Sequence, residues 1–76
     1  MDINDFVKNF AEQLEDTDPA TIIASTNYKE IPEWSSIVAL MVIGMIEEEY
    51  SVEIGSADLH NASTIQELFE VVKAKA

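Results

Sequence analysis

The chain has 76 residues, of which 15 are acidic and 4 are lysines, so its formal net charge at pH 7 is −11. This charge repels nucleic-acid backbones and anionic membranes, and it favours partners that present basic patches. Without cysteine the chain has no disulfide framework, thiolate metal site or cysteine nucleophile, whereas a hydrophobic content of 47 % is enough for one folded domain over residues 1–76.

A first helix is predicted over residues 3–14. Its apolar residues recur at i, i+3, i+4, i+7, i+8 and i+11, which places a single apolar stripe on a helix. Asp2 is a suitable cap for it. The first residues have neither the basic region nor the long apolar run of a signal peptide, so a cytoplasmic location is expected.

A long connection without periodicity follows over residues 15–34. Asp18 is expected to cap a short helical turn through residues 20–24, because Pro19 is well tolerated at a first helical position. Trp34 is expected to pack this connection against the next helix. The side chains expected to hold the connection on the core are Ile22, Ile23, Tyr28 and Ile31.

A central helix is predicted over residues 36–50. Ten residues from Ile37 to Ile46 lack a polar side chain, and Glu47-Glu48-Glu49-Tyr50 follows them. Either Ser35 or Ser36 is a suitable cap. The apolar run is about half the length of a bilayer span, so membrane insertion is not expected. The expected core face consists of Ala39, Val42, Ile43, Ile46 and Tyr50.

The opposite face of this helix is not polar, although a small domain cannot surround one helix completely. Some of its apolar side chains should therefore stay near the surface, beside the glutamates, where other proteins would touch them. Helix geometry is equally compatible with a helix buried on all sides. Gly44 either admits a partner's backbone or is merely tolerated, and the sequence leaves this open. The side chains expected near the surface come from Ile37, Val38, Met41 and Met45.

Two further helices are predicted. After an extended segment that buries Val52 and Ile54, Ser56 is expected to cap a short helix over residues 57–61. Ser63 and Gln66 fit a capping box that opens the last helix. Its core stripe is Ile65, Leu68, Phe69 and Val72. The predicted fold class is all-α, a four-helix bundle of three longer helices and one short helix.

The inventory of reactive side chains is poor. The single histidine, His60, is expected at the surface, and no second histidine can complete a metal pair. Glu47, Glu48 and Glu49 point in different directions on a helix, and no calcium-loop pattern surrounds them. We therefore expect neither a catalytic site nor a metal site, and no enzymatic activity.

Ser35-Ser36-Ile37, the apolar helix and its Glu-Glu-Glu-Tyr ending together resemble the acyl carrier protein family over the whole chain. In that family an Asp-Ser-Leu tripeptide opens the second of four helices, and its serine carries 4′-phosphopantetheine. Counting back from Tyr50 without a gap places Ser36 at the attachment position and Ser35 in place of the aspartate. Tyr28 and the segment 52–54 also match positions of the family.

The resemblance implies a monomeric carrier of acyl thioesters whose partners are a phosphopantetheinyl transferase (holo-ACP synthase) and acyl-processing enzymes. Fatty-acid carriers often have acidic residues where Val38 and Met41 stand, which favours a dedicated partner and a specialised fatty-acid, polyketide or related pathway. The alternative is an unmodified acidic adaptor that binds a protein through the second helix. The expected docking residues are Ile37, Val38, Met41, Glu47 and Glu48, and the expected acyl-pocket lining is Tyr28, Ile46, Ile54 and Phe69.

Overall fold

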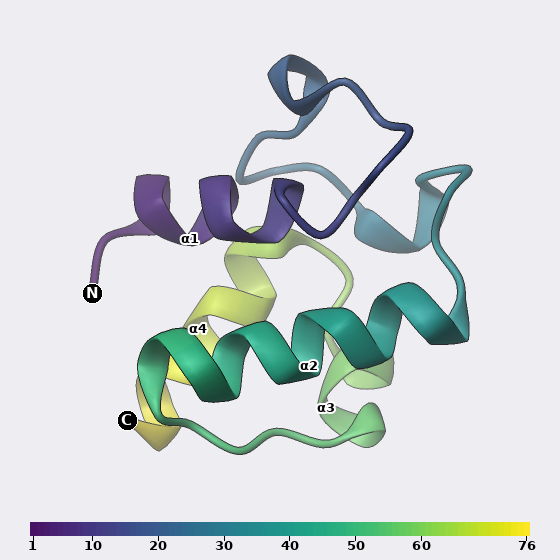
Figure 1. The fold of residues 1–76 in the computed structure, drawn as a ribbon. Helices are drawn as coiled ribbons and strands as arrows, with labels where there is room; N and C mark the ends of the chain where they lie inside the picture. Colours follow the sequence, from purple (N-terminus) through teal and green to yellow (C-terminus); the bar gives the residue numbers. More distant parts are fainter.

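The computed structural model describes residues 1–76 and confirms the all-α four-helix bundle. The helices are α1 (Ile3–Ala11), α2 (Ser36–Tyr50), α3 (Ser56–Asn61) and α4 (Ile65–Lys75), with 3₁₀ turns η1 (Pro19–Thr21) and η2 (Tyr28–Glu30) between α1 and α2. Helix α2 packs against α1 and α3, and α4 closes the bundle by packing against the same two helices (Figure 1). No helix combines the length and apolarity needed to cross a membrane.

The core is entirely apolar. Nineteen residues are buried, and none of them is charged or carries an unpaired buried polar atom. Phe6 and Phe10 of α1 are fully buried, and the Phe6 ring lies against the rings of Tyr50 in α2 and Phe69 in α4. In the segment between α2 and α3, Val52 and Ile54 are buried while Glu53 is exposed, which confirms the predicted alternation.

Helix α1 is shorter than predicted. Asp2 caps it as expected, since its Oδ1 accepts a hydrogen bond from the Asn4 N–H at 2.9 Å. The helix ends at Ala11, because the N–H groups of Gln13 and Leu14 bond three residues back, in the tighter geometry common at helix ends. Leu14 is buried as its spacing suggested, although it lies outside the helix.

Helix α4 begins with a capping box one residue later than predicted. Thr64 Oγ1 accepts from the Glu67 N–H at 3.1 Å, and Glu67 Oε1 accepts from the Thr64 N–H at 2.9 Å. The predicted pairing of Ser63 with Gln66 is wrong, because the Gln66 N–H already donates to the carbonyl of Ala24 at 2.8 Å. At α3, Ser56 is the first helical residue and not the cap.

The long connection is fixed to the start of α4. Besides the Ala24 bond, the Thr26 carbonyl accepts from the Ile65 N–H at 3.1 Å, and the Tyr28 N–H donates to the Ser63 carbonyl at 3.1 Å. The loop thus supplies acceptors for N–H groups that a helix start leaves unpaired.

Within the connection, the Asp18 cap is confirmed. Its Oδ1 accepts from the Ala20 N–H at 3.0 Å, although the turn that it begins ends at Thr21. Of the four residues expected to hold the loop on the core, three are buried. Ile23 is 57 % exposed, so its assignment was wrong; it lies in a turn closed by a bond from the Thr26 N–H to its carbonyl.

Trp34 connects the loop to α1. Its ring is stacked on that of Phe10, with centroids 6.0 Å apart and planes at 8°, and lies 4.8 Å from the Tyr28 ring. The sequence predicted packing against the central helix, yet the aromatic partners belong to α1 and η2. This aromatic group holds the segment that leads into α2 against the core.

Candidate functional site

The two serines at the start of α2 have different roles. Ser35 has an extended backbone and is the cap, since its Oγ accepts from the Val38 N–H at 3.2 Å. Ser36 is the first helical residue; its side chain is exposed and makes no hydrogen bond within the protein. The structure therefore decides which serine is the cap, and it leaves the Ser36 hydroxyl available for chemistry.

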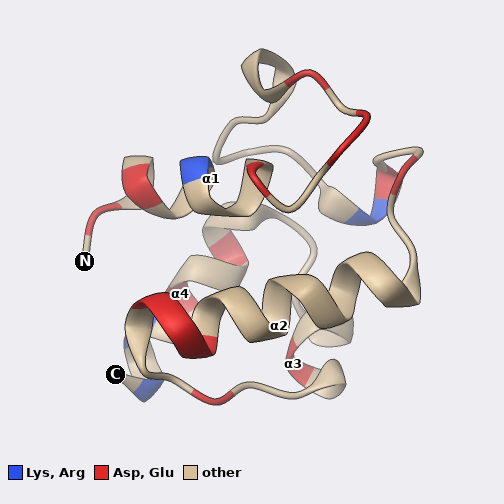
Figure 2. Ribbon diagram, in the orientation of Figure 1, with Lys and Arg blue, Asp and Glu red and all other residues tan.

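The surroundings of the Ser36 hydroxyl favour an anion. The N–H groups of Ser36 and Ile37 make no hydrogen bond within the protein, and the first main-chain bond of the helix runs from the Ala39 N–H to the Ser35 carbonyl. Such free donors lie at the positive end of the helix dipole. No charged residue occurs in α2 before its glutamates, as Figure 2 shows, so no carboxylate of this helix opposes an anion at its start.

The nearest carboxylate before the serines is occupied elsewhere. Glu33 accepts hydrogen bonds from the Glu15 N–H at 2.7 Å, the Asp16 N–H at 3.1 Å and the Thr17 hydroxyl at 2.7 Å. These bonds, that from Thr17 above all, lower the pKa of the Glu33 carboxyl. Glu33 therefore joins the end of the long connection to its beginning and fixes the chain where it enters α2.

Most of the expected docking residues are accessible. Ile37 and Met41 are 70 % and 39 % exposed, and Glu47 and Glu48 are exposed in the last turns. Val38 is only 7 % exposed, so its expected place on the surface was wrong. Met45, also expected near the surface, is buried as well, so the core face of α2 is rotated from the predicted one. Its buried residues are Val38, Val42, Met45 and Ile46, whereas Ala39, Ile43 and Tyr50 of the predicted face are only half-buried.

Leu40 was missed in the sequence, although it is 67 % exposed. It lies three residues after Ile37 and one before Met41, on the same side of the helix as both. The helical spacing from Ile37 was the available signal, but in a helix that is apolar all round this spacing does not tell which residues face solvent.

The four candidates for an acyl pocket come together in the core. Tyr28, Ile46, Ile54 and Phe69 are all buried, with exposures of 0 to 8 %. No cavity opens among them, because the three hollows of the molecule lie at its surface and none is lined by these residues. The interior is closed in this structure.

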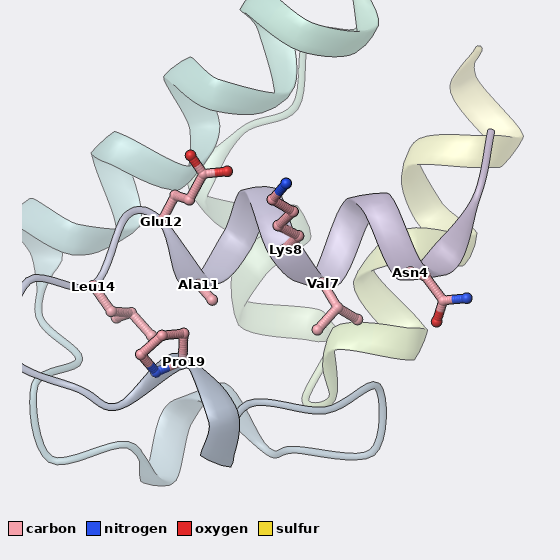
Figure 3. Close-up of a pocket in the computed structure, with 7 residues that line it drawn as sticks. All are labelled: Asn4, Val7, Lys8, Ala11, Glu12, Leu14 and Pro19. Carbon is pink, nitrogen blue, oxygen red and sulfur yellow. The ribbon is translucent and has the colours of Figure 1, made fainter.

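Two of the surface hollows have partly apolar walls. One of about 490 Å³ lies between α1 and η1, where Figure 3 shows Leu14 and Pro19 meeting at one end. The other, of about 230 Å³, lies near the start of α2, and His60, which is exposed as predicted, lines it with Lys29 and Trp34. The Lys29 ammonium donates to the His60 carbonyl. No cluster of three or more acidic or histidine side chains could hold a metal ion.

A small helical bundle that offers one uncommitted serine hydroxyl at the positive end of its longest helix has the architecture of a carrier domain. Residues 5–72 match the family model for the phosphopantetheine attachment site, and the chain belongs to this family. The resemblance to acyl carrier proteins is thereby confirmed, as is 4′-phosphopantetheine as the covalently attached cofactor. A comparison with curated proteins finds no match.

Proposed function

We propose that Ser36 carries the phosphopantetheine arm and that the chain delivers acyl or related intermediates as thioesters in a specialised fatty-acid, polyketide or related pathway. The observation that carries the proposal is the division between the two serines: Ser35 is used as the cap, and Ser36 is exposed with its hydroxyl uncommitted. If Ser35 carried the arm, its Oγ would become part of the phosphodiester, and the hydrogen bond that it accepts from the Val38 N–H would be disturbed. The Ser36 hydroxyl makes no such bond, so its modification leaves the helix cap intact.

The residues around Ser36 fit the group. When bound, the arm supplies a thiol that forms thioesters, which the chain itself cannot provide because it has no cysteine. Ser36 and Ile37 would hold the phosphate next to their free N–H groups, where a helix dipole favours negative charge. A carrier of this kind needs no catalytic groups of its own, and we assign the chemistry to its partner enzymes.

These partners are a phosphopantetheinyl transferase and acyl-processing enzymes with basic patches, which suit a net charge of −11. We assign docking to Ile37, Met41, Glu47 and Glu48. Cargo could enter the core beside Tyr28, Ile46, Ile54 and Phe69 only if the helices moved apart, since the interior is closed. A monomeric state and a cytoplasmic location belong to the same proposal.

The test is the intact mass of two serine variants after incubation with coenzyme A and a phosphopantetheinyl transferase. Ser36→Ala should remain folded and gain no mass. Ser35→Ala should still gain the mass of one phosphopantetheine, while its free energy of unfolding falls by about 1 kcal/mol because the cap is lost.

The reverse result, with modification lost in Ser35→Ala and kept in Ser36→Ala, would move the site to Ser35. If no transferase modified the wild-type protein, the unmodified adaptor that binds a partner through α2 would be the better account.

A further inference from the structure

The hollow of about 230 Å³ lies next to the proposed attachment serine, and we refer to it as the Trp34 hollow. Two of its lining residues flank Ser36 in the chain. Trp34 lies two positions before it, and Ala39 lies three positions after it, on the same side of α2. A group attached to Ser36 therefore begins beside this hollow. The lining residues are Lys29, Trp34, Ala39, Ser56, Leu59 and His60.

The Trp34 hollow differs in charge from the other two hollows of the molecule. No carboxylate lines it, although the chain has 15 acidic residues. By contrast, Glu12 lines the hollow beside α1, and Asp16 and Glu33 line the third hollow. Lys29 instead contributes an ammonium group to the Trp34 hollow. This part of the surface therefore attracts an anionic group held at Ser36, in a chain that elsewhere repels anions.

Two carboxylates near this hollow are engaged in other contacts. In α3, Asp58 accepts a hydrogen bond from the Gly55 N–H at 3.0 Å and pairs with the Lys75 ammonium at 3.2 Å. In α4, Glu67 accepts from the Thr64 N–H at 2.9 Å. Neither carboxylate makes an ion pair with Lys29, because the Lys75–Asp58 pair is the only one in the protein.

The polar side chains of the Trp34 hollow have hydrogen-bond donors to spare. The indole N–H of Trp34 and the hydroxyl of Ser56 make no hydrogen bond within the protein. The Lys29 ammonium donates to the carbonyl of His60, which uses one of its three donors. A ligand with several acceptors and some apolar surface would complement these donors and the apolar side chains of Ala39 and Leu59.

The hollow is also held in shape before any ligand binds. Tyr28 and Lys29 donate from η2 to carbonyls in the last turn of α3, and the ring of Trp34 is stacked on that of Phe10. The two walls are thus fixed relative to each other. A preformed site costs a ligand less ordering than one that must first assemble.

Resting on the proposed attachment at Ser36, we propose that the Trp34 hollow binds the phosphopantetheine arm when the arm folds back on its own carrier. Pantetheine presents two amide carbonyls as acceptors for Lys29 and Trp34, and its two geminal methyl groups pack against Ala39 and Leu59. The volume of about 230 Å³ is below the range of pockets that enclose a whole ligand. The hollow therefore holds only part of the arm and leaves its thiol in solvent.

Trp34 is the only tryptophan of the chain, so its fluorescence reports directly on this site. The unmodified protein is compared with protein that has been modified by a phosphopantetheinyl transferase and coenzyme A. Modification should reduce the quenching of Trp34 by acrylamide, because the arm covers the ring. It should also give nuclear Overhauser contacts between the geminal methyl groups and the indole. These contacts are measured without any substitution, so they do not depend on how a variant folds.

Lys29→Gln tests the hydrogen bond from the charged side chain. It should lower the ratio of bound to free arm about tenfold, the loss expected for one such bond. Acrylamide quenching of the modified variant should then return nearly to the value of its unmodified form. Lys29→Arg keeps the charge and should keep the protection. Lys8→Gln removes a lysine of α1 that does not line the hollow, and as the matched control it should behave like the wild type.

The outcomes separate this proposal from the attachment of the arm. Wild-type protein that no transferase modifies would refute the attachment itself. Wild-type protein that is modified, but whose Trp34 is quenched equally with and without the arm and shows no contact to it, would overturn the binding of the arm in this hollow and leave Ser36 as the attachment residue. Protection that persists fully in Lys29→Gln would overturn the assigned role of Lys29 and the site built on it.

Discussion

The hydroxyl of Tyr28 donates a hydrogen bond of 2.5 Å to the main-chain carbonyl of Leu59, and so joins the long connection to α3. The Tyr28 ring is fully buried and lies against the rings of Phe10 and Trp34. Burial, with a smaller contribution from the charge of Glu67, raises the pKa of Tyr28 to about 12. Tyr28, in η2, thus connects α1 and α3 and contacts Trp34 in the segment that leads into α2.

Tyr28→Phe should lower the free energy of unfolding by about 1–3 kcal/mol, because it leaves the Leu59 carbonyl without its partner in a buried site. Urea denaturation at neutral pH measures the loss. The control is Tyr50→Phe, whose hydroxyl accepts from the Asn9 side chain at 2.9 Å in a partly exposed place and should matter less. Equal losses in the two variants would show that the buried bond has no special weight.

The same residue should govern part of the alkaline stability. The pKa of Tyr28 is raised on folding from 10.0 to about 12, so the unfolded chain releases this proton first. The contribution of Tyr28 is therefore fully present below pH 10 and is lost as pH rises toward 12. Tyr28→Phe should lose less stability over this interval than the wild type. The measurement is the denaturant midpoint of both proteins between pH 9 and pH 11. If Tyr28 is not the titrating group, the midpoints of the variant and of the wild type will fall in parallel.

Ile46 and Met41 lie on opposite sides of α2 and should respond differently to substitution. Ile46→Ala should destabilise the fold by about 2–5 kcal/mol, because the side chain is fully buried. Met41→Glu should leave folding nearly intact, since Met41 is 39 % exposed, while it weakens binding to the transferase. Thermal unfolding at moderate salt measures the first effect and a binding titration the second. A Met41→Glu protein as unstable as Ile46→Ala would place Met41 in the core.

Glu33→Gln should destabilise the fold, because an uncharged amide oxygen replaces a carboxylate that accepts three hydrogen bonds. The pKa of Glu33 is lowered on folding from 4.5, so its contribution is present above that pH and is lost as pH falls through the lowered value. The variant should show less acid dependence than the wild type. Glu30→Gln, at an exposed residue whose side chain makes no hydrogen bond, is the control and should behave like the wild type.

Added salt or millimolar magnesium should raise the thermal midpoint. Fifteen acidic residues against four lysines repel one another on a small body, and the single ion pair, between Lys75 and Asp58, offsets little of this. Calorimetry at low and moderate ionic strength measures the shift. A midpoint that stayed constant or fell would mean that charge repulsion does not limit stability.

Most helical elements could be predicted because their signals are local. The apolar stripe of α1, the uninterrupted run of α2 from Ser36 to Tyr50 and the alternation of Val52 and Ile54 depend on near neighbours in the chain. The candidate attachment serine is likewise found from the sequence, because the number of residues between Ser36 and Tyr50 matches the family without a gap. Sequence alone therefore established the fold class, the family resemblance and the candidate serine.

Tertiary structure decided which way each element faces. Periodicity fixes the angles between residues of α2 but not the direction of its core, and packing against α1 and α3 buried Val38 while leaving Leu40 exposed. The cap of α4 moved to Thr64 because the carbonyl of Ala24, 42 positions from Gln66 in the chain, occupies the Gln66 N–H. Ser35 and Ser36 are chemically alike, and only the backbone direction where the chain enters α2 makes one the cap and leaves the other free.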